Sequence, residues 1–126
     1  MLAGLFSKKQ KKEMNWNILT DVSMLDEIDE KSFEKPVLIF KHSTRCSISS
    51  MVLNKFERNY HDLDNFEIYF LDLIANREVS NEIESRYGII HQSPQAILIK
   101  EGKAIYDQSH TGINYDAVDR KASKEK

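Results

Sequence analysis

Apolar residues along this chain occur in two patterns, as short continuous runs and as stripes that recur every three or four positions. Continuous runs at residues 37–40 and 96–99 predict strands that are buried on both faces of a sheet. The stripes predict amphipathic helices, because residues three and four apart lie on the same side of a helix. One such stripe follows the first of these strands and is formed by Ile48, Met51, Val52 and Phe56.

Further segments continue this alternation. Strands are predicted at residues 16–19, 66–73 and 103–108, and the dipeptide Glu101-Gly102 predicts a hairpin turn before the last of them. Three more helical stripes are formed by Val22, Leu25 and Ile28, by Val79, Ile83 and Tyr87, and by Ile113, Ala117 and Val118. The chain is therefore expected to place a helix after each of its first strands.

The order β-α-β-α-β-α-β-β-α predicts an α/β fold in which a central mixed sheet carries helices on both faces. Alternating strands and helices favour parallel pairing, and the closing hairpin adds an antiparallel edge. Asp21 is expected to cap the first helix, and Gly88 to end the helix that contains Ile83. We expect one domain at residues 14–120, between a flexible basic tail at 1–13 and a polar C-terminal tail at 121–126.

Composition narrows the class of protein. The chain has 126 residues, of which 40% are hydrophobic and 30% charged, as is typical of one soluble globular domain. A net charge of −2 and a pI of about 6.1 argue against a general nucleic-acid binder. No apolar run is long enough to predict a membrane span. A single cysteine excludes an internal disulfide and, with no signal peptide recognised, predicts a cytoplasmic location.

The single cysteine, Cys46, lies between the strand predicted at 37–40 and the helix that follows it. A cysteine at the N-terminus of a helix is close to unpaired backbone N–H groups and to the positive end of the helix dipole, which favour the thiolate. Lys41 and Arg45, in the polar turn before it, either add to this effect or are solvated surface charges. We interpret Cys46 as a reactive thiol; the alternative is a small buried apolar side chain.

Two other residue types bear on the site. Pro94 precedes the strand predicted at 96–99, where proline is tolerated because it donates no hydrogen bond to the sheet. The four histidines, His42, His61, His91 and His110, do not have the spacing of a zinc site. We therefore expect no metal centre.

The predicted order resembles the thioredoxin fold, in which the reactive cysteine opens the second helix. Residues 41–49, Lys-His-Ser-Thr-Arg-Cys-Ser-Ile-Ser, resemble the active-site stretch of the monothiol bacilliredoxins, whose pattern is a threonine, any residue and then Cys-Pro-Ile-Ser. Residues 91–95 and 109–110 also resemble this family, and the similarity extends over residues 16–113. One position differs, because Ser47 stands where the family has a proline, which is pre-organised for a first helical turn. This difference is expected to affect the acidity of the Cys46 thiol and the rate at which it reacts more than the type of reaction.

The resemblance implies a cis peptide bond before Pro94, which would lie beside Cys46, with Ser93 offering backbone groups to a bound disulfide. Ser49 occupies the place of the second cysteine of dithiol relatives, and a serine cannot resolve a disulfide. Cys46 would therefore attack a mixed disulfide and stay linked to one sulfur partner until a second thiol releases it.

For this cycle the resemblance implies the following roles. Cys46 is the catalytic residue, and bacillithiol is the exchanging low-molecular-weight thiol, with no bound cofactor. Bacillithiolated cytosolic proteins are the transient partners. The thiol-contacting residues are expected to be Thr44, Arg45, Ser47, Ser49, Ser93 and Pro94. Thr44 is also expected to cap the helix, or else to place its hydroxyl near the sulfur.

Two other functions fit the same sequence. One is a non-catalytic thioredoxin-like binding module in which Cys46 is inert, which the serine at position 47 favours. The other is an iron–sulfur protein of the monothiol glutaredoxin type, in which two chains and two small thiols hold the cluster. The sequence does not predict the oligomeric state.

Overall fold

The computed structural model describes residues 14–60 and 65–125, so the basic tail predicted at residues 1–13 lies outside the described residues. The strands are β1 (Asn17–Ile18), β2 (Val37–His42), β3 (Glu67–Asp72), β4 (Gln95–Lys100) and β5 (Lys103–Ser109). The helices are α2 (Met24–Lys31), α3 (Ser47–Arg58), α4 (Arg77–Tyr87) and α5 (Tyr115–Lys124), with a 3₁₀ turn, η1 (His110–Gly112), before the last. Over the described residues this is the predicted order.

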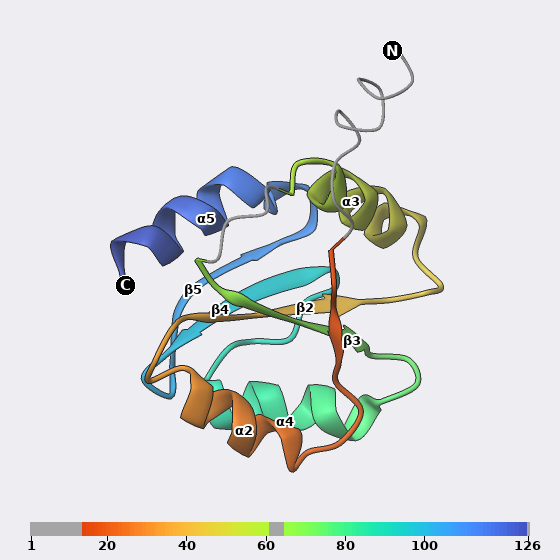
Figure 1. Cartoon of the computed structure of the whole chain (residues 1–126). Coiled ribbons are helices and arrows are strands. Elements are labelled where there is room, and N and C mark those ends of the chain that lie inside the picture. The colour runs from red at the N-terminus through yellow and green to blue at the C-terminus, as the bar shows by residue number, and fades with distance from the viewer. Residues whose placement is uncertain (1–13, 61–64, 126) are drawn as a thin grey trace, which may run out of the picture.

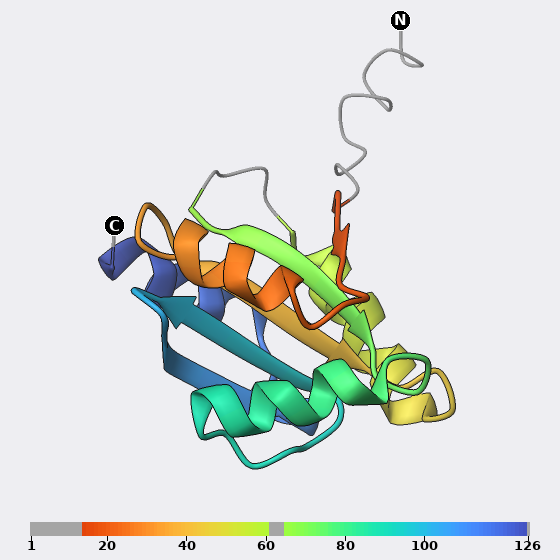
Figure 2. The ribbon, with the colours of Figure 1, turned by 90° about the horizontal axis from the view of Figure 1, so that it is seen from below.

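The strands form a single mixed sheet in the order β1-β3-β2-β4-β5, with β2 in the middle. Helices α2 and α4 cover one face of the sheet and α3 and α5 cover the other (Figure 1). The fold is therefore the predicted α/β arrangement with helices on both faces. Only β1, β3 and β2 are parallel, because β4 pairs antiparallel with β2 although a helix precedes it. The loop after α4 returns the chain to the end of the sheet where β2 ends (Figure 2).

Each face of the sheet has its own hydrophobic core, and the alternation of side chains along β2 supplies both. Val37 and Ile39 pack with Leu25 of α2 and Ile83 of α4. Leu38 and Phe40 face the other way and pack under α3 and α5, against residues that include Val52, Phe56 and Val118. A strand that is buried on both faces needs a continuous apolar sequence, which is what residues 37–40 provide.

Two turns have the backbone geometry that their residues predict. Gly88 ends α4 in the left-handed conformation, with φ of +67°. Glu101 and Gly102 form the hairpin between β4 and β5, with φ of +53° and +75°. At the start of α2, the N-cap residue is Ser23, and Asp21 accepts a hydrogen bond from the Ser23 backbone N–H in the preceding turn.

Strand β2 is longer than predicted. Lys41 and His42 were expected in a polar turn, but they continue the strand and pair with Leu71 and Asp72 of β3. Lys41 is fully buried and His42 is only 6% exposed. The prediction failed because burial of these polar side chains depends on hydrogen-bond partners far along the chain.

The buried faces of α3 and α5 also differ from the predicted stripes. In α3 the buried residues are Ser49, Val52 and Phe56, whereas Ile48 and Met51 are 47% and 56% exposed. Helix α5 begins at Tyr115 and runs to Lys124, so residues 121–124 are helical, although they were assigned to a polar tail. The physical reason is Ala122, which is four residues after Val118, shares its helix face and is fully buried.

The position of Ala122 gives a test of this end of the fold. We expect Ala122→Asp to lower the free energy of unfolding by at least about 2 kcal/mol, because it buries a carboxylate in the core. Ser123→Asp, on the exposed neighbour, should change it by less than about 0.5 kcal/mol. Denaturant unfolding measures both values. Equal effects of the two substitutions would show that residues 121–124 do not pack as α5.

Candidate active site

Cys46 is the N-cap residue of α3, in an extended conformation with φ of −114° and ψ of 118°. Its backbone N–H donates to the Ser43 carbonyl at 3.2 Å, and its carbonyl accepts the N–H of Ser50 at 3.2 Å. The cysteine is partly exposed, and its side chain forms no capping hydrogen bond. The first turn of α3 contains no acidic residue, so no carboxylate within this turn competes for its backbone N–H groups. The sulfur therefore lies beside the first-turn N–H groups of α3.

The turn before Cys46 is fastened to α3 by Ser49. The fully buried Ser49 hydroxyl accepts a hydrogen bond from the Ser43 backbone N–H at 3.1 Å and lies 2.8 Å from Nδ1 of His42. Because the hydroxyl oxygen accepts from Ser43, its own hydrogen is free to donate to His42. Ser49 therefore joins the end of β2, the turn and the first turn of α3.

His42 is suited to accept this bond because it is neutral. Burial lowers the pKa of His42 below its ordinary value of 6.5. Its ring packs against the Phe70 ring with centroids 5.5 Å apart, on the face of the sheet covered by α3. The neutral ring accepts at Nδ1 and carries its proton on Nε2.

On the neighbouring strand, the peptide bond between Ser93 and Pro94 is cis, as the resemblance implied. Lys41 pairs with Gln95 in the sheet, so Pro94 lies at the level of His42, the last residue of β2, at the same end as the turn that leads to Cys46. The Pro94 carbonyl accepts the His110 N–H at 2.9 Å. Among the described residues, the Ser93 hydroxyl oxygen is buried and has no hydrogen-bond partner.

The loop before Pro94 is held by the buried side chain of Lys41. Its Nζ lies 2.7 Å from Nδ1 of His91 and 3.2 Å from the side-chain oxygen of Gln95. The same Gln95 oxygen accepts the Gln92 N–H at 3.4 Å, and the Gln95 amide donates to the Ile90 carbonyl at 3.1 Å. One lysine of β2 thus organises the loop that contains the cis peptide bond.

The charges in this cluster follow from burial. Burial lowers the pKa of Lys41 to about 8, so at neutral pH its ammonium still donates to His91 and Gln95. Burial, and then the nearby Lys41 charge, lower the pKa of His91. His91 is therefore neutral at pH 7 and accepts at Nδ1.

The structure places the predicted site residues in two groups. Thr44, Arg45 and Ser47 are exposed beside Cys46, at the open end of α3. Ser93 and Pro94 belong to the neighbouring loop, and Ser49 is buried beneath the turn.

Two expectations about single residues need correction. Thr44 does not cap α3, because the N-cap residue is Cys46, and no side-chain capping hydrogen bond is formed there. Lys41 is not a solvated surface charge, since it is fully buried. His42, His91 and Gln95, which form polar contacts around the site, were not predicted. The only available signal was the pair of polar residues that directly follows the run at 37–40.

Within residues 14–60 and 65–125, no group of three or more His, Cys, Asp or Glu side chains is arranged to hold a metal ion. None of the helices in this part of the chain is long and apolar enough to cross a membrane.

Residues 17–118 match the model of the family described as monothiol bacilliredoxin BrxC. The chain belongs to the monothiol bacilliredoxin family. Membership supports a role in thiol redox chemistry.

Solved structures show the same fold. This bacilliredoxin has a TM-score of 0.72 and 24% identity to a candidate oxidoreductase with a thioredoxin fold, over 84% of this chain and 91% of the other. Thioredoxin from Malassezia sympodialis gives a TM-score of 0.68 at 14% identity, with 92% and 94% covered. Thioredoxin from Fasciola hepatica gives 0.68 at 15% identity, with 87% and 99% covered. The predicted thioredoxin-like fold is confirmed.

The fastening role of Ser49 can be measured in this bacilliredoxin. Ser49→Ala should lower the free energy of unfolding by about 1–3 kcal/mol, because it leaves the Ser43 N–H and His42 Nδ1 without their partner. Ser50→Ala, the same change at the exposed neighbouring position, should have an effect below about 0.5 kcal/mol. Denaturant unfolding of the two variants decides the matter, and a Ser49→Ala value as small as the control would contradict the assigned hydrogen bonds.

The two neutral histidines predict how stability depends on pH. Because the folded-state pKa values of His42 and His91 lie below 6.5, the unfolded chain binds more protons at mildly acidic pH. The free energy of unfolding should therefore fall as pH drops from about 6.5 toward those lower values. His91→Asn keeps an acceptor for Lys41 but removes one titrating group, so the decrease should be shallower. Unfolding measured from pH 5 to 7.5 tests this, and an unchanged pH dependence would refute the assignment of a neutral His91.

Proposed function

We propose that this chain is a monothiol thiol-disulfide oxidoreductase that removes bacillithiol from mixed disulfides on cytosolic proteins, with Cys46 as nucleophile. The observation that carries the proposal is the pairing of Cys46 with Ser49. The cysteine is partly exposed at the start of α3, and the position of a resolving cysteine holds a buried serine. Family membership supports thiol redox chemistry. The identity of the thiol and the direction of transfer are the proposed part.

The first step is an exchange of one disulfide for another. The Cys46 thiolate attacks the bacillithiol sulfur of a client mixed disulfide and forms a new S–S bond to it. The old S–S bond breaks, and the client cysteine leaves as a thiolate that takes a proton from solvent. No net oxidation occurs, because one disulfide is lost and one is formed.

The second step needs a thiol from outside the chain. Because Ser49 carries no sulfur, the Cys46–bacillithiol disulfide persists until a second thiolate attacks its bacillithiol sulfur. That attack expels the Cys46 thiolate and leaves bacillithiol in a disulfide with the incoming thiol. A sulfur that is stabilised as an anion is the better leaving group, so the N-terminus of α3 assists this release.

The surroundings of Cys46 support binding of a small thiol. Arg45 is exposed beside the cysteine and offers a guanidinium to the carboxylates of such a molecule. The buried Ser93 hydroxyl, which has no partner in the described part of the chain, offers a polar group next to Pro94. Ser47 adds a backbone N–H that the family's proline lacks, and a sulfur anion at the N-cap is close to such first-turn donors.

The proposal predicts which small disulfides modify the protein. After exposure to oxidised bacillithiol, intact-protein mass spectrometry should show a single bacillithiol adduct, which a second thiol then removes. The adduct should be absent in Cys46→Ala, and it should form at least about tenfold faster than adducts from oxidised glutathione or coenzyme A disulfide, a difference of about 1.4 kcal/mol in activation free energy.

Other results would decide against parts of this function. No adduct from any of the three disulfides at neutral pH would contradict the enzyme and leave a thioredoxin-like binding module. Equal rates with all three would keep the thiol exchange but remove bacillithiol as its preferred partner.

A further inference from the structure

One face of α3 leads away from Cys46 and is not covered by the rest of the described chain. Ile48, Met51, Lys55 and Arg58 are spaced by three, four and three residues, which places them on one side of the helix. All four side chains are exposed, including the two large apolar ones nearest the cysteine. Exposed apolar residues next to a reactive group are the usual mark of a contact surface.

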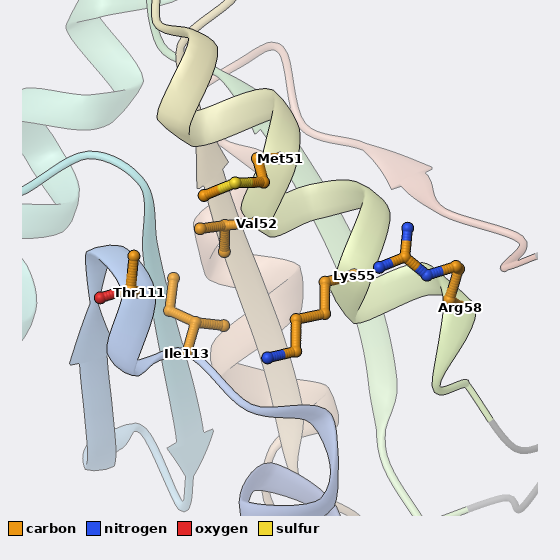
Figure 3. Close-up of a pocket in the computed structure, with 6 residues that line it drawn as sticks. All are labelled: Met51, Val52, Lys55, Arg58, Thr111 and Ile113. Carbon is orange, nitrogen blue, oxygen red and sulfur yellow. The ribbon is translucent and has the colours of Figure 1, made fainter.

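Beside this face lies a groove with a volume of about 340 Å³, between α3 and the η1 segment (Figure 3). Buried Val52 and Ile113 form its apolar floor. The Lys55 side chain extends from α3 toward Ile113, and Arg58 lies one turn further along the helix. The residues that line it are Met51, Val52, Lys55, Arg58, Thr111 and Ile113.

Among the described residues, no acidic side chain lines the groove, and the side chains of Lys55 and Arg58 form no ion pair or hydrogen bond. The described part of the chain therefore leaves the positive charge of these two side chains unbalanced. The whole chain has a net charge of −2, so this is a local feature rather than a generally basic surface. A ligand that matches it carries negative charge and some apolar surface.

The distance from Cys46 to Lys55 and Arg58 bears on whether the ligand of the groove is a small thiol or a polypeptide. At about 1.5 Å of rise per residue, Lys55 and Arg58 lie about 14 and 18 Å along α3 from Cys46. Because Arg58 is the last residue of α3, a ligand that is bonded to the sulfur and contacts both side chains follows the length of this helix, which favours a polypeptide over a low-molecular-weight thiol. An extended polypeptide advances about 3.3 Å per residue, so it covers these distances in about four to six residues.

We propose that this groove binds an acidic segment of the client protein, located about four to six residues from the client's modified cysteine. The inference rests on the thiol exchange proposed for Cys46 and adds the kind of client that the protein selects. Met51 and Val52 contact the apolar part of the segment, and Lys55 and Arg58 pair with its carboxylates.

Direct binding tests the groove without any chemistry at Cys46. The probes are fluorescent peptides with serine in place of the client cysteine, and with either glutamates or glutamines at four to six residues on one side of that serine or the other. Wild-type protein should bind one of the glutamate peptides at least about tenfold more tightly than its glutamine counterpart at low salt, and this preference should decrease as salt is added.

Two double variants test whether the preference for glutamate peptides comes from the groove. Lys55→Glu/Arg58→Glu should abolish the preference for glutamate. Lys100→Glu/Lys103→Glu, on the two sides of the β4–β5 turn and outside the lining of the groove, makes the same change in net charge and should retain it. The rate at which oxidised bacillithiol modifies Cys46 should be the same in the wild type and both variants.

Each contrary result has a distinct meaning. Equal affinity of wild type for glutamate and glutamine peptides overturns the docking proposal, even if bacillithiol still modifies Cys46. Equal loss of preference in both double variants overturns it too, since net charge alone would explain the binding. A slower reaction with oxidised bacillithiol in the groove variant alone would assign the groove to the small thiol. If oxidised bacillithiol never modifies Cys46 in the wild type, the proposed function fails, while the peptide affinities still decide the docking.

Discussion

The site depends on one constraint, which is that the last two residues of a strand buried on both faces are polar. Lys41 and His42 end β2, and both are buried. A buried polar group without a hydrogen-bond partner costs about 1–3 kcal/mol, so each side chain must find partners within the protein. Because neighbouring strand residues point to opposite faces, Lys41 and His42 find them in different parts of the chain.

These two sets of partners form the two halves of the site. On the α4 face, Lys41 bonds to His91 and Gln95 and so holds the loop that ends in the cis Ser93–Pro94 bond. On the α3 face, His42 bonds to Ser49 and so holds the turn that presents Cys46. A serine at position 49 therefore has two consequences. Its lack of sulfur agrees with membership of a monothiol family, and its hydroxyl fastens the turn before Cys46 to α3.

Much of this arrangement was readable from the sequence, because local signals dominate it. The apolar run at 37–40, the stop at Gly88 and the hairpin at Glu101-Gly102 each depend on a few adjacent residues. The position of Cys46 at the start of a helix was likewise local, and the cis bond at Pro94 came from the family resemblance.

The buried polar contacts that hold the site together could not be predicted in the same way. Polar residues after an apolar run are most often solvated, and nothing near Lys41 indicates that it is buried against residues 91 and 95. In α3, Ile48 and Met51 have helical spacing, and so do Ser49, Val52 and Phe56. The sequence does not distinguish which set is buried, and the structure shows that the set with Ser49 faces the core. That outcome leaves Ile48 and Met51 exposed beside the cysteine, where they are available to partners.

The central claim is that Cys46 forms a disulfide with one bacillithiol, and that this disulfide persists until a thiol from outside the chain reduces it. The most direct measurement is intact-protein mass spectrometry of both proteins. Equal amounts of this protein and a bacillithiolated client are mixed without other thiols, and the reaction is quenched with acid. The account predicts that the client loses its bacillithiol as Cys46 gains it, and that the adduct then persists. A client that keeps its bacillithiol, or that becomes linked to Cys46 while bacillithiol is released, would contradict the account.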